Sequence, residues 1–168
     1  TGSPFDSFIT TRGLRTLGVR IRQHVENAEK VVDYLNQHPL IERVLYPGLK
    51  NHPTHEIAAK QQNGFGAMFS FCLNLDKACL KTFVHNLEYF SLAESLGGVE
   101  SLICHPVTMT HAAMSPEALK EAGIGSNLLR LSVGIEDVND LIDYALGESQ
   151  LKSLTASPVK EPAISSQP

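Results

Sequence analysis

The residue with the clearest capacity for chemistry is Arg130, which stands in the apolar run 128–133. The alternation in this run predicts a strand in which Leu129 and Leu131 face the core, while Arg130 points to the opposite face. A guanidinium group with so much apolar sequence around it requires an anion. That anion is either a carboxylate of the protein, in a structural ion pair, or the carboxylate of a ligand, which a planar two-pronged donor binds well. The spacing alone leaves both alternatives open.

A second candidate is the polar loop 93–101, in which Gly97 and Gly98 follow an expected strand. Two adjacent glycines let the backbone turn sharply or approach another group closely. Serine and glutamate residues flank these glycines, and polar loops at strand ends often carry the sites of α/β proteins. The same sequence also suits a plain turn, so both interpretations stand at this point.

Histidines and cysteines form no recognisable site. His52 and His55 lie three residues apart, but no acidic or cysteine ligand completes a metal set at a known spacing. The three cysteines lack a C-x-x-C pair and are expected to be buried reduced thiols: Cys72, Cys79 and Cys104. The sequence also lacks a G-x-S-x-G elbow, a P-loop and a complete G-x-G-x-x-G motif. We therefore expect no metal site and no hydrolase triad.

The composition is that of a globular chain. The 168 residues are 42% hydrophobic and 19% charged, which excludes disorder of the whole chain. The formal net charge of -4 and the lack of a basic run argue against nucleic acid as a partner. No apolar run approaches the roughly 18 residues of a membrane helix, and the N-terminus does not resemble a secretion signal. We expect no membrane association and a cytoplasmic location.

The elements that must position these residues begin with a long helix. Apolar residues recur at spacings of three and four from Leu14 to Leu35. Ser3 and Pro4 are typical of a helix start, and His38 ends the helix because the residue before a proline leaves the helical region. A helix this long is expected to connect two domains.

Strands and shorter helices alternate after the long helix, which predicts an α/β or α+β unit. Strands are expected at 41–46, 67–73, 90–93, 102–106 and 129–133, and helices at 54–62, at 76–87, from 115 and around 138–146. From Ser149 onward, prolines and serines without periodicity predict a disordered tail. The expected organisation is a long helix over 1–38, a small domain over 39–148 and the tail over 149–168.

Seven sequence blocks occur in the same order in the pyridoxal-phosphate (PLP) enzymes of cysteine and methionine metabolism. The chain resembles this family from Ser3 to Leu146, and several long blocks in a fixed order are highly specific for it. The blocks are Ser3–Ser7, Arg12–Leu17, Tyr46–Gly48, Gly64–Met68, Ala93–Leu102, Met109–Ala112 and Leu129–Asp137.

The resemblance implies the C-terminal small domain of a fold-type I PLP enzyme. Such a domain is an antiparallel-rich sheet with helices on one face, joined by a long helix to a larger cofactor domain. The resemblance also implies roles in substrate binding. Arg130 would grip the α-carboxylate of the amino-acid substrate, and Ser95 and Leu96 would position substrate and the catalytic lysine. Glu94 would occupy a pocket position that varies among members, and Thr110 would approach the same site.

Within the family the sequence is most similar to the γ-synthases. The implied reaction replaces the γ-substituent of an O-acylhomoserine by cysteine to form cystathionine, a step of trans-sulfuration and methionine biosynthesis. A γ-lyase acting on cystathionine or methionine is the alternative. The implied partners are the amino-acid substrate, the N-terminal PLP domain and further copies in a homotetramer.

One departure from the family pattern concerns lysine. The family's cofactor lysine stands in a Ser-x-Thr-Lys context, and none of the lysines of this chain does. A lysine amine is needed to hold PLP and to move protons, so the isolated chain is expected to be inactive. A hypothesis of another class is a non-catalytic truncated remnant or interaction module, which the proline- and serine-rich tail favours slightly.

Overall fold

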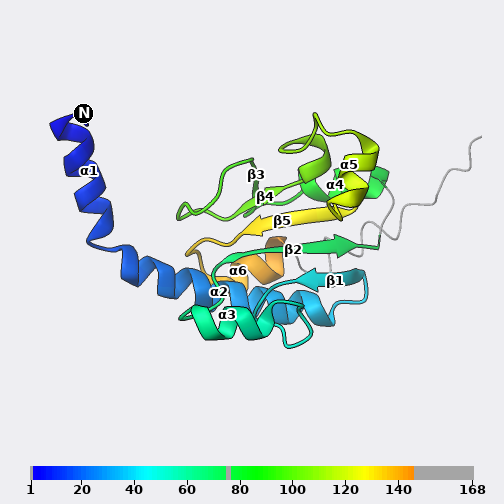
Figure 1. The fold of residues 1–168 in the computed structure, drawn as a ribbon, viewed down its shortest axis with the longest axis horizontal. Helices are drawn as coiled ribbons and strands as arrows, with labels where there is room; N and C mark the ends of the chain where they lie inside the picture. The colour runs from blue at the N-terminus through cyan, green and yellow to red at the C-terminus, as the bar shows by residue number, and fades with distance from the viewer. Residues whose placement is uncertain (1, 75–76, 146–168) are drawn as a thin grey trace, which may run out of the picture.

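The structure, a computed structural model, describes residues 2–74 and 77–145, and the tail expected over 149–168 lies outside this part. Its centre is a five-stranded sheet in the order β1-β2-β5-β4-β3 (Figure 1). The strands are β1 Ile41–Leu45, β2 Met68–Leu73, β3 Ser91–Leu92, β4 Leu102–Cys104 and β5 Leu128–Ser132. Neighbouring strands are antiparallel except β3 and β4, which are parallel. The predicted mixed fold with an antiparallel-rich sheet is confirmed.

Helical segments precede, separate and follow these strands. They are α1 Pro4–Leu14, α2 Leu17–Gln37, α3 His55–Gln61, α4 Lys77–His85, α5 Pro116–Glu121 and α6 Val138–Asp140, with a 3-10 turn at Pro106–Thr108 and a π-helical turn at Leu141–Ala145. Ser115 caps α5 by accepting a hydrogen bond from the Ala118 amide. Proline has no backbone N–H, so Pro116 at the first helical position leaves no amide without a partner there. Ser115 and Pro116 together therefore set the start of this helix.

The core lies on one face of the sheet, where α2, α4 and the turn after α6 pack against alternate strand residues. Phe71 on β2 and Ile103 on β4 are fully buried, and so are Leu129 and Leu131 on β5. The helices contribute the buried side chains Ala28, Val31, Val32, Leu35, Leu80, Phe83, Val84 and Leu141. Because side chains alternate across a strand, the residues between these core positions point to the other face. Arg130 is one of them.

The expected continuous helix over residues 3–38 is interrupted. Helix α1 ends at Leu14 and α2 begins at Leu17, and in Figure 1 α1 projects away from the sheet at an angle to α2. Thr16 leaves the helical region with a φ of -111° and a ψ of 4°. Its hydroxyl and the guanidinium of Arg20 both donate to the carbonyl of Gly13. The Thr16 amide also donates to this carbonyl at 3.4 Å, so the chain closes a tighter turn here, where a continuous α-helix would pair Gly13 with the amide of Leu17.

The apolar stripe expected along this helix is buried only in its second half. Ala28, Val32 and Leu35 enter the core, whereas α1 has no buried residue. The exposed large apolar side chains of the first part are Phe5, Phe8, Ile9, Leu14, Leu17, Val19 and Ile21. These side chains therefore contribute nothing to the core formed by the described residues.

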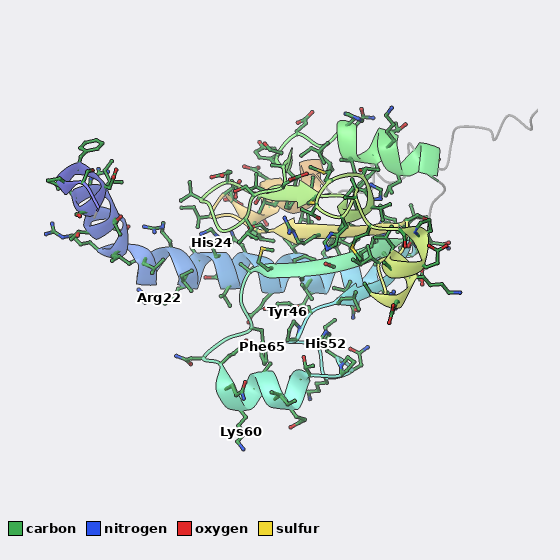
Figure 2. All side chains as sticks on the ribbon, turned by 45° about the horizontal axis from the view of Figure 1, so that its top comes forward. Arg22, His24, Tyr46, His52, Lys60 and Phe65 are labelled. Carbon is green, nitrogen blue, oxygen red and sulfur yellow. The ribbon has the colours of Figure 1, made fainter. Side chains whose placement is uncertain are left out.

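Tyr46 anchors the segment that carries α3. Its ring meets those of Phe65 and Phe69 edge-on at centroid distances of 6.2 and 6.0 Å, and its hydroxyl donates to the carbonyl of Gly66 at 3.0 Å. Figure 2 shows α3 set apart from the sheet, with Tyr46 and Phe65 between them. Gly48 is required beside this ring, because a Cβ there would lie 2.9 Å from Tyr46 Cδ1.

Alkaline pH is expected to destabilise the fold through Tyr46. Burial raises the pKa of Tyr46 to about 12, against 10.0 for a free tyrosine. Above pH 10 the unfolded chain therefore loses the proton first, and stability falls until the folded form also ionises near pH 12. At about pH 11 the loss is about 1 kcal/mol. Urea unfolding of the parent and of Tyr46→Phe at about pH 8 and pH 11 measures it. Equal alkaline losses in both proteins would contradict this assignment.

Two of the three cysteines follow the expectation of buried thiols. Cys72 and Cys104 are buried, whereas Cys79 is only partly buried. Helix α4 directs Leu80, Phe83 and Val84 into the core. Cys79 stands at the edge of that stripe, which explains the difference. Within the described ranges, no helix is both long and apolar enough to cross a bilayer.

Candidate functional site

Arg130 occupies the middle of the central strand β5. Its direct partners are Ser70 on β2 and Cys104 on β4. Directly opposed residues of paired strands project from the same face, so these three side chains share the face opposite the main core. Both neighbours are small, which leaves the long arginine side chain as the dominant group at this point of the sheet.

The guanidinium group of Arg130 is held by the backbone of the loop that follows β3. Its Nη2 donates to the carbonyl oxygens of Glu94 and Ser95, at 2.9 and 3.3 Å. Its Nε is buried and has no hydrogen-bond partner, and it is the one buried side-chain nitrogen or oxygen of the described residues in this condition. A buried N–H without a partner costs about 1 to 3 kcal/mol, which an acceptor of a ligand would offset.

No carboxylate of the described part of the chain pairs with Arg130. The one ion pair found over residues 2–74 and 77–145 joins Lys30 to Glu26 within α2 and does not involve Arg130. The sequence left two partners open for the guanidinium, and the first of them, a carboxylate of the protein, is not found among the described residues. The remaining donor capacity of Arg130 suits a planar carboxylate of a ligand.

The loop between β3 and β4 is fastened to β5 and to the segment after it. The amide of Gly97 donates to Ser132 Oγ at 2.9 Å, and the amide of Ile135 donates to the carbonyl of Val99 at 2.9 Å. Gly97 has a φ of +76°, a region that side chains rarely allow. The expected role of the double glycine as a sharp turn is therefore seen at Gly97.

The residues expected to bind substrate are not all in contact with Arg130. Glu94 and Ser95 meet the guanidinium through their carbonyls, while their side chains are exposed. Leu96 is the next loop residue and is 55% exposed. Thr110 Oγ1 lies 2.7 Å from His111 Nδ1 and 4.0 Å from the sulfur of Cys104, the strand partner of Arg130. Thr110 thus approaches Cys104, which is paired with Arg130 in the sheet, rather than Arg130 itself.

Two buried polar residues of α2 hold the segment that follows β5, and the sequence pattern assigns no role to either. His24 Nδ1 lies 2.7 Å from the carbonyl of Val133, and Figure 2 places His24 on the helix beside the sheet. Asn27 Nδ2 donates to the carbonyls of Gly134 and Glu136, at 3.1 and 2.8 Å. A polar residue on the buried side of an amphipathic helix was the available signal, because such a group must find a partner.

A cavity of about 460 Å³ lies elsewhere, between α4 and the segment 105–109. Its lining is largely apolar and includes Val84, Leu92 and Met109, but neither Arg130 nor the loop carbonyls that hold it. Arg130 and the loop carbonyls that hold it thus lie outside this cavity.

The lysine side chains do not fit a complete PLP site. Cofactor attachment requires a lysine amine directed into the site and partly protected from water. The lysines whose side chains are described are all exposed: Lys30, Lys50, Lys60, Lys81 and Lys120. The described side chains therefore offer donors for a carboxylate, and none of the five described lysine side chains fits as the anchor of the cofactor.

Comparison with known proteins connects this arrangement to one family. The profile of the Cys/Met metabolism PLP-dependent enzymes matches residues 1–145. Cystathionine gamma-synthase of Escherichia coli K12 is 54% identical over 142 residues, which cover 84% of this chain and 37% of that protein. Cystathionine gamma-lyase of Dictyostelium discoideum is 50% identical over 140 residues, covering 83% and 36%.

A solved structure gives the same result. Cystathionine gamma synthase from Xanthomonas oryzae pv. oryzae, in complex with aminoacrylate and cysteine, superposes with a TM-score of 0.85 at 54% identity, over 92% of this chain and 40% of that one. The chain thus spans less than half the length of these relatives. The family match extends over all of the described residues, and the fold agrees with it. The chain belongs to the Cys/Met metabolism PLP-dependent enzyme family.

Proposed function

We propose that this chain is the C-terminal, substrate-carboxylate-binding part of a PLP-dependent cystathionine γ-synthase. The complete protein would replace the γ-substituent of an O-acylhomoserine by cysteine. The observation that carries the proposal is the buried Nε of Arg130, which has no partner among the described residues. Similarity to cystathionine gamma-synthases at 54% identity supports the choice of reaction.

Arg130 binds the α-carboxylate of the amino-acid substrate in this proposal. The bonds from Nη2 to the carbonyls of Glu94 and Ser95 fix the plane of the guanidinium before substrate arrives. A donor that is already oriented loses little conformational entropy on binding. The partnerless Nε–H then donates to a carboxylate oxygen, so the carboxylate sets the orientation of the rest of the substrate.

The loop side chains have accessory roles in the proposal. Glu94 and Leu96 are exposed at the rim of the Arg130 site, where Glu94 would select the distal group of the substrate. Ser95 and Leu96 would position substrate and the lysine supplied by the rest of the protein. Thr110, beside Cys104, would border the same space.

The remaining part of the protein would hold the PLP. The exposed lysines of this chain do not fit that task, so the isolated chain would be inactive. The exposed apolar side chains of α1 and of the first half of α2, Phe8 and Val19 among them, would pack against that larger domain. Such packing would make α1 and α2 the interdomain helices, in a complete protein that assembles as a homotetramer.

A γ-lyase is the second candidate, because cystathionine gamma-lyase and L-methionine gamma-lyase relatives are 50% and 51% identical to this chain. A non-catalytic remnant is the third, and it predicts no turnover by any protein that contains this chain.

A product assay on the complete protein separates these candidates. Supplied with PLP, an O-acylhomoserine and cysteine, it is expected to form cystathionine as the main product, because γ-replacement needs an oriented substrate carboxylate and a second amino acid. The products are measured by chromatography, with a reaction without cysteine as the control. Dominant release of a 2-oxo acid and ammonia from cystathionine or methionine would instead identify a γ-lyase. No turnover of any of these amino acids would support the remnant.

A further inference from the structure

The carboxylate of Glu136 is directed at a single residue, Ser101. Its Oε1 accepts from the Ser101 amide at 2.6 Å, and its Oε2 accepts from the Ser101 hydroxyl at 2.9 Å. The same hydroxyl accepts a hydrogen bond from the amide of Gly134 at 2.8 Å. Ser101 is fully buried and stands directly before β4.

Counting hydrogens shows why a carboxylate is needed at Glu136. The amide and the hydroxyl of Ser101 each carry one hydrogen to donate, and the hydroxyl oxygen already accepts from Gly134. Two acceptor atoms are therefore required opposite Ser101. An ionised carboxylate supplies both, whereas an amide side chain supplies one acceptor and one donor. A glutamine at this position would supply one acceptor for the two hydrogens, so either the amide or the hydroxyl of Ser101 would lose its acceptor.

The base of this contact is itself held in place. Asn27 on α2 donates to the carbonyls of Gly134 and Glu136, and its own oxygen accepts from Gln23 at 2.9 Å. Asn27 is fully buried, so its bonds are shielded from water. Asn27 thus fixes the backbone at Glu136 relative to α2, and the carboxylate of Glu136 in turn fixes Ser101.

Ser101 in turn ends the loop that holds Arg130. The loop begins after β3, provides the Glu94 and Ser95 carbonyls to the guanidinium, and returns to the sheet at Ser101. Its other hydrogen bonds to the sheet and to the segment after β5 are neutral, and they include those of Ala93, Gly97 and Val99. Apart from the bonds of the Arg130 guanidinium itself, the bonds from Ser101 to Glu136 are the charge-assisted ones of this loop, and such bonds are shorter and stronger than neutral ones.

We propose that Glu136 is a positioning residue for the carboxylate site. By accepting both hydrogens of Ser101, it holds the loop carbonyls at the place where they orient the Arg130 guanidinium. The proposal rests on the proposed function of Arg130 and adds a residue that touches neither substrate nor guanidinium. Its effect on substrate must pass through Arg130.

The test uses the complete protein that contains this chain, with kcat and KM measured for its amino-acid substrate. Glu136→Gln is expected to raise KM about tenfold, the loss that one charge-assisted hydrogen bond produces. We expect kcat to change by less than about threefold. Ser101→Ala, which removes only the hydroxyl, is the second variant and is expected to raise KM by a smaller factor. Glu100→Gln is the matched control. Glu100 is exposed, precedes Ser101 in the loop and makes none of these bonds, so loss of its charge is expected to leave KM unchanged.

A double-mutant cycle with Arg130→Lys decides whether the effect passes through Arg130. Lysine keeps the charge but cannot use the two loop carbonyls in the same way, so it is expected to raise KM by itself. In this background Glu136→Gln should raise KM by less than about twofold further. An equal increase in both backgrounds, or a decrease in kcat alone from loss of folded protein, would overturn the positioning role.

The outcomes separate this inference from the proposed function. If Arg130→Lys raises KM but neither Glu136→Gln nor Ser101→Ala does, the positioning role is wrong while the carboxylate site stands. If Arg130→Lys leaves KM unchanged, the carboxylate site itself is wrong, and the positioning role is overturned with it.

Discussion

Replacing Arg130 with alanine in the complete protein is expected to weaken binding of the amino-acid substrate by about 1.5 to 3 kcal/mol or more, which corresponds to at least about a tenfold increase in Kd. The guanidinium is already oriented by the carbonyls of Glu94 and Ser95, and its Nε has no partner within the described residues. Removing it therefore deletes the charged donor of the site, and no carboxylate among the described residues loses a partner with it. Titration of the parent and the variant with substrate measures the change.

Two controls make the Arg130 result specific. Arg43→Ala removes the same charge from β1 of the same sheet, where Arg43 donates to the sulfur of Cys72, and is expected to leave substrate affinity unchanged. A substrate analogue with a carboxamide in place of the α-carboxylate should bind the parent weakly and lose little further affinity in Arg130→Ala. Equal affinities of the parent and of Arg130→Ala for the intact amino acid would rule out the assignment.

Substitution of Gly134 by alanine is expected to be the most damaging small change to the fold around the site. A Cβ at this position would lie 2.7 Å from the carbonyl carbon of Glu100 and would also collide with the carbonyl oxygen of Val99. Both are backbone atoms, which cannot move aside as a flexible side chain can. The displacement would break the bonds that join this segment to the loop, including the bond from the Gly134 amide to Ser101. We expect a loss of about 2 to 3 kcal/mol in the free energy of unfolding.

Urea unfolding of the chain measures this loss, and Gly13→Ala is the matched control. Gly13 lies near the end of α1, and a Cβ there would meet nothing within 4 Å. Alanine exceeds glycine in helix propensity by about 1 kcal/mol, so Gly13→Ala is expected to be neutral or stabilising. A Gly134→Ala variant as stable as the parent would show that the loop does not pack against the segment after β5 as described.

The strands and their faces were predictable because they depend on local alternation. The run with Phe69 and Phe71 alternating against Ser70 predicts both the strand and its buried face, and the structure agrees. The placement of Arg130 on the opposite face follows from the same rule. Helix α2 was less predictable, since Leu17 and Ile21 belong to the apolar stripe yet are exposed. Periodicity indicates which residues share a face, but not whether another element covers that face.

The sequence by itself determined the family, the order of strands and helices, and the presence of an arginine on one face of β5, because these depend on residue identity, spacing and local periodicity. Only the tertiary structure decided what that arginine contacts. The carbonyls of Glu94 and Ser95 come from 35 to 36 residues away along the chain, and the contact of Asn27 with Glu136 joins residues 109 apart. Backbone carbonyls carry no signature in a sequence, and long-range hydrogen bonds form only after the core has brought their strands together.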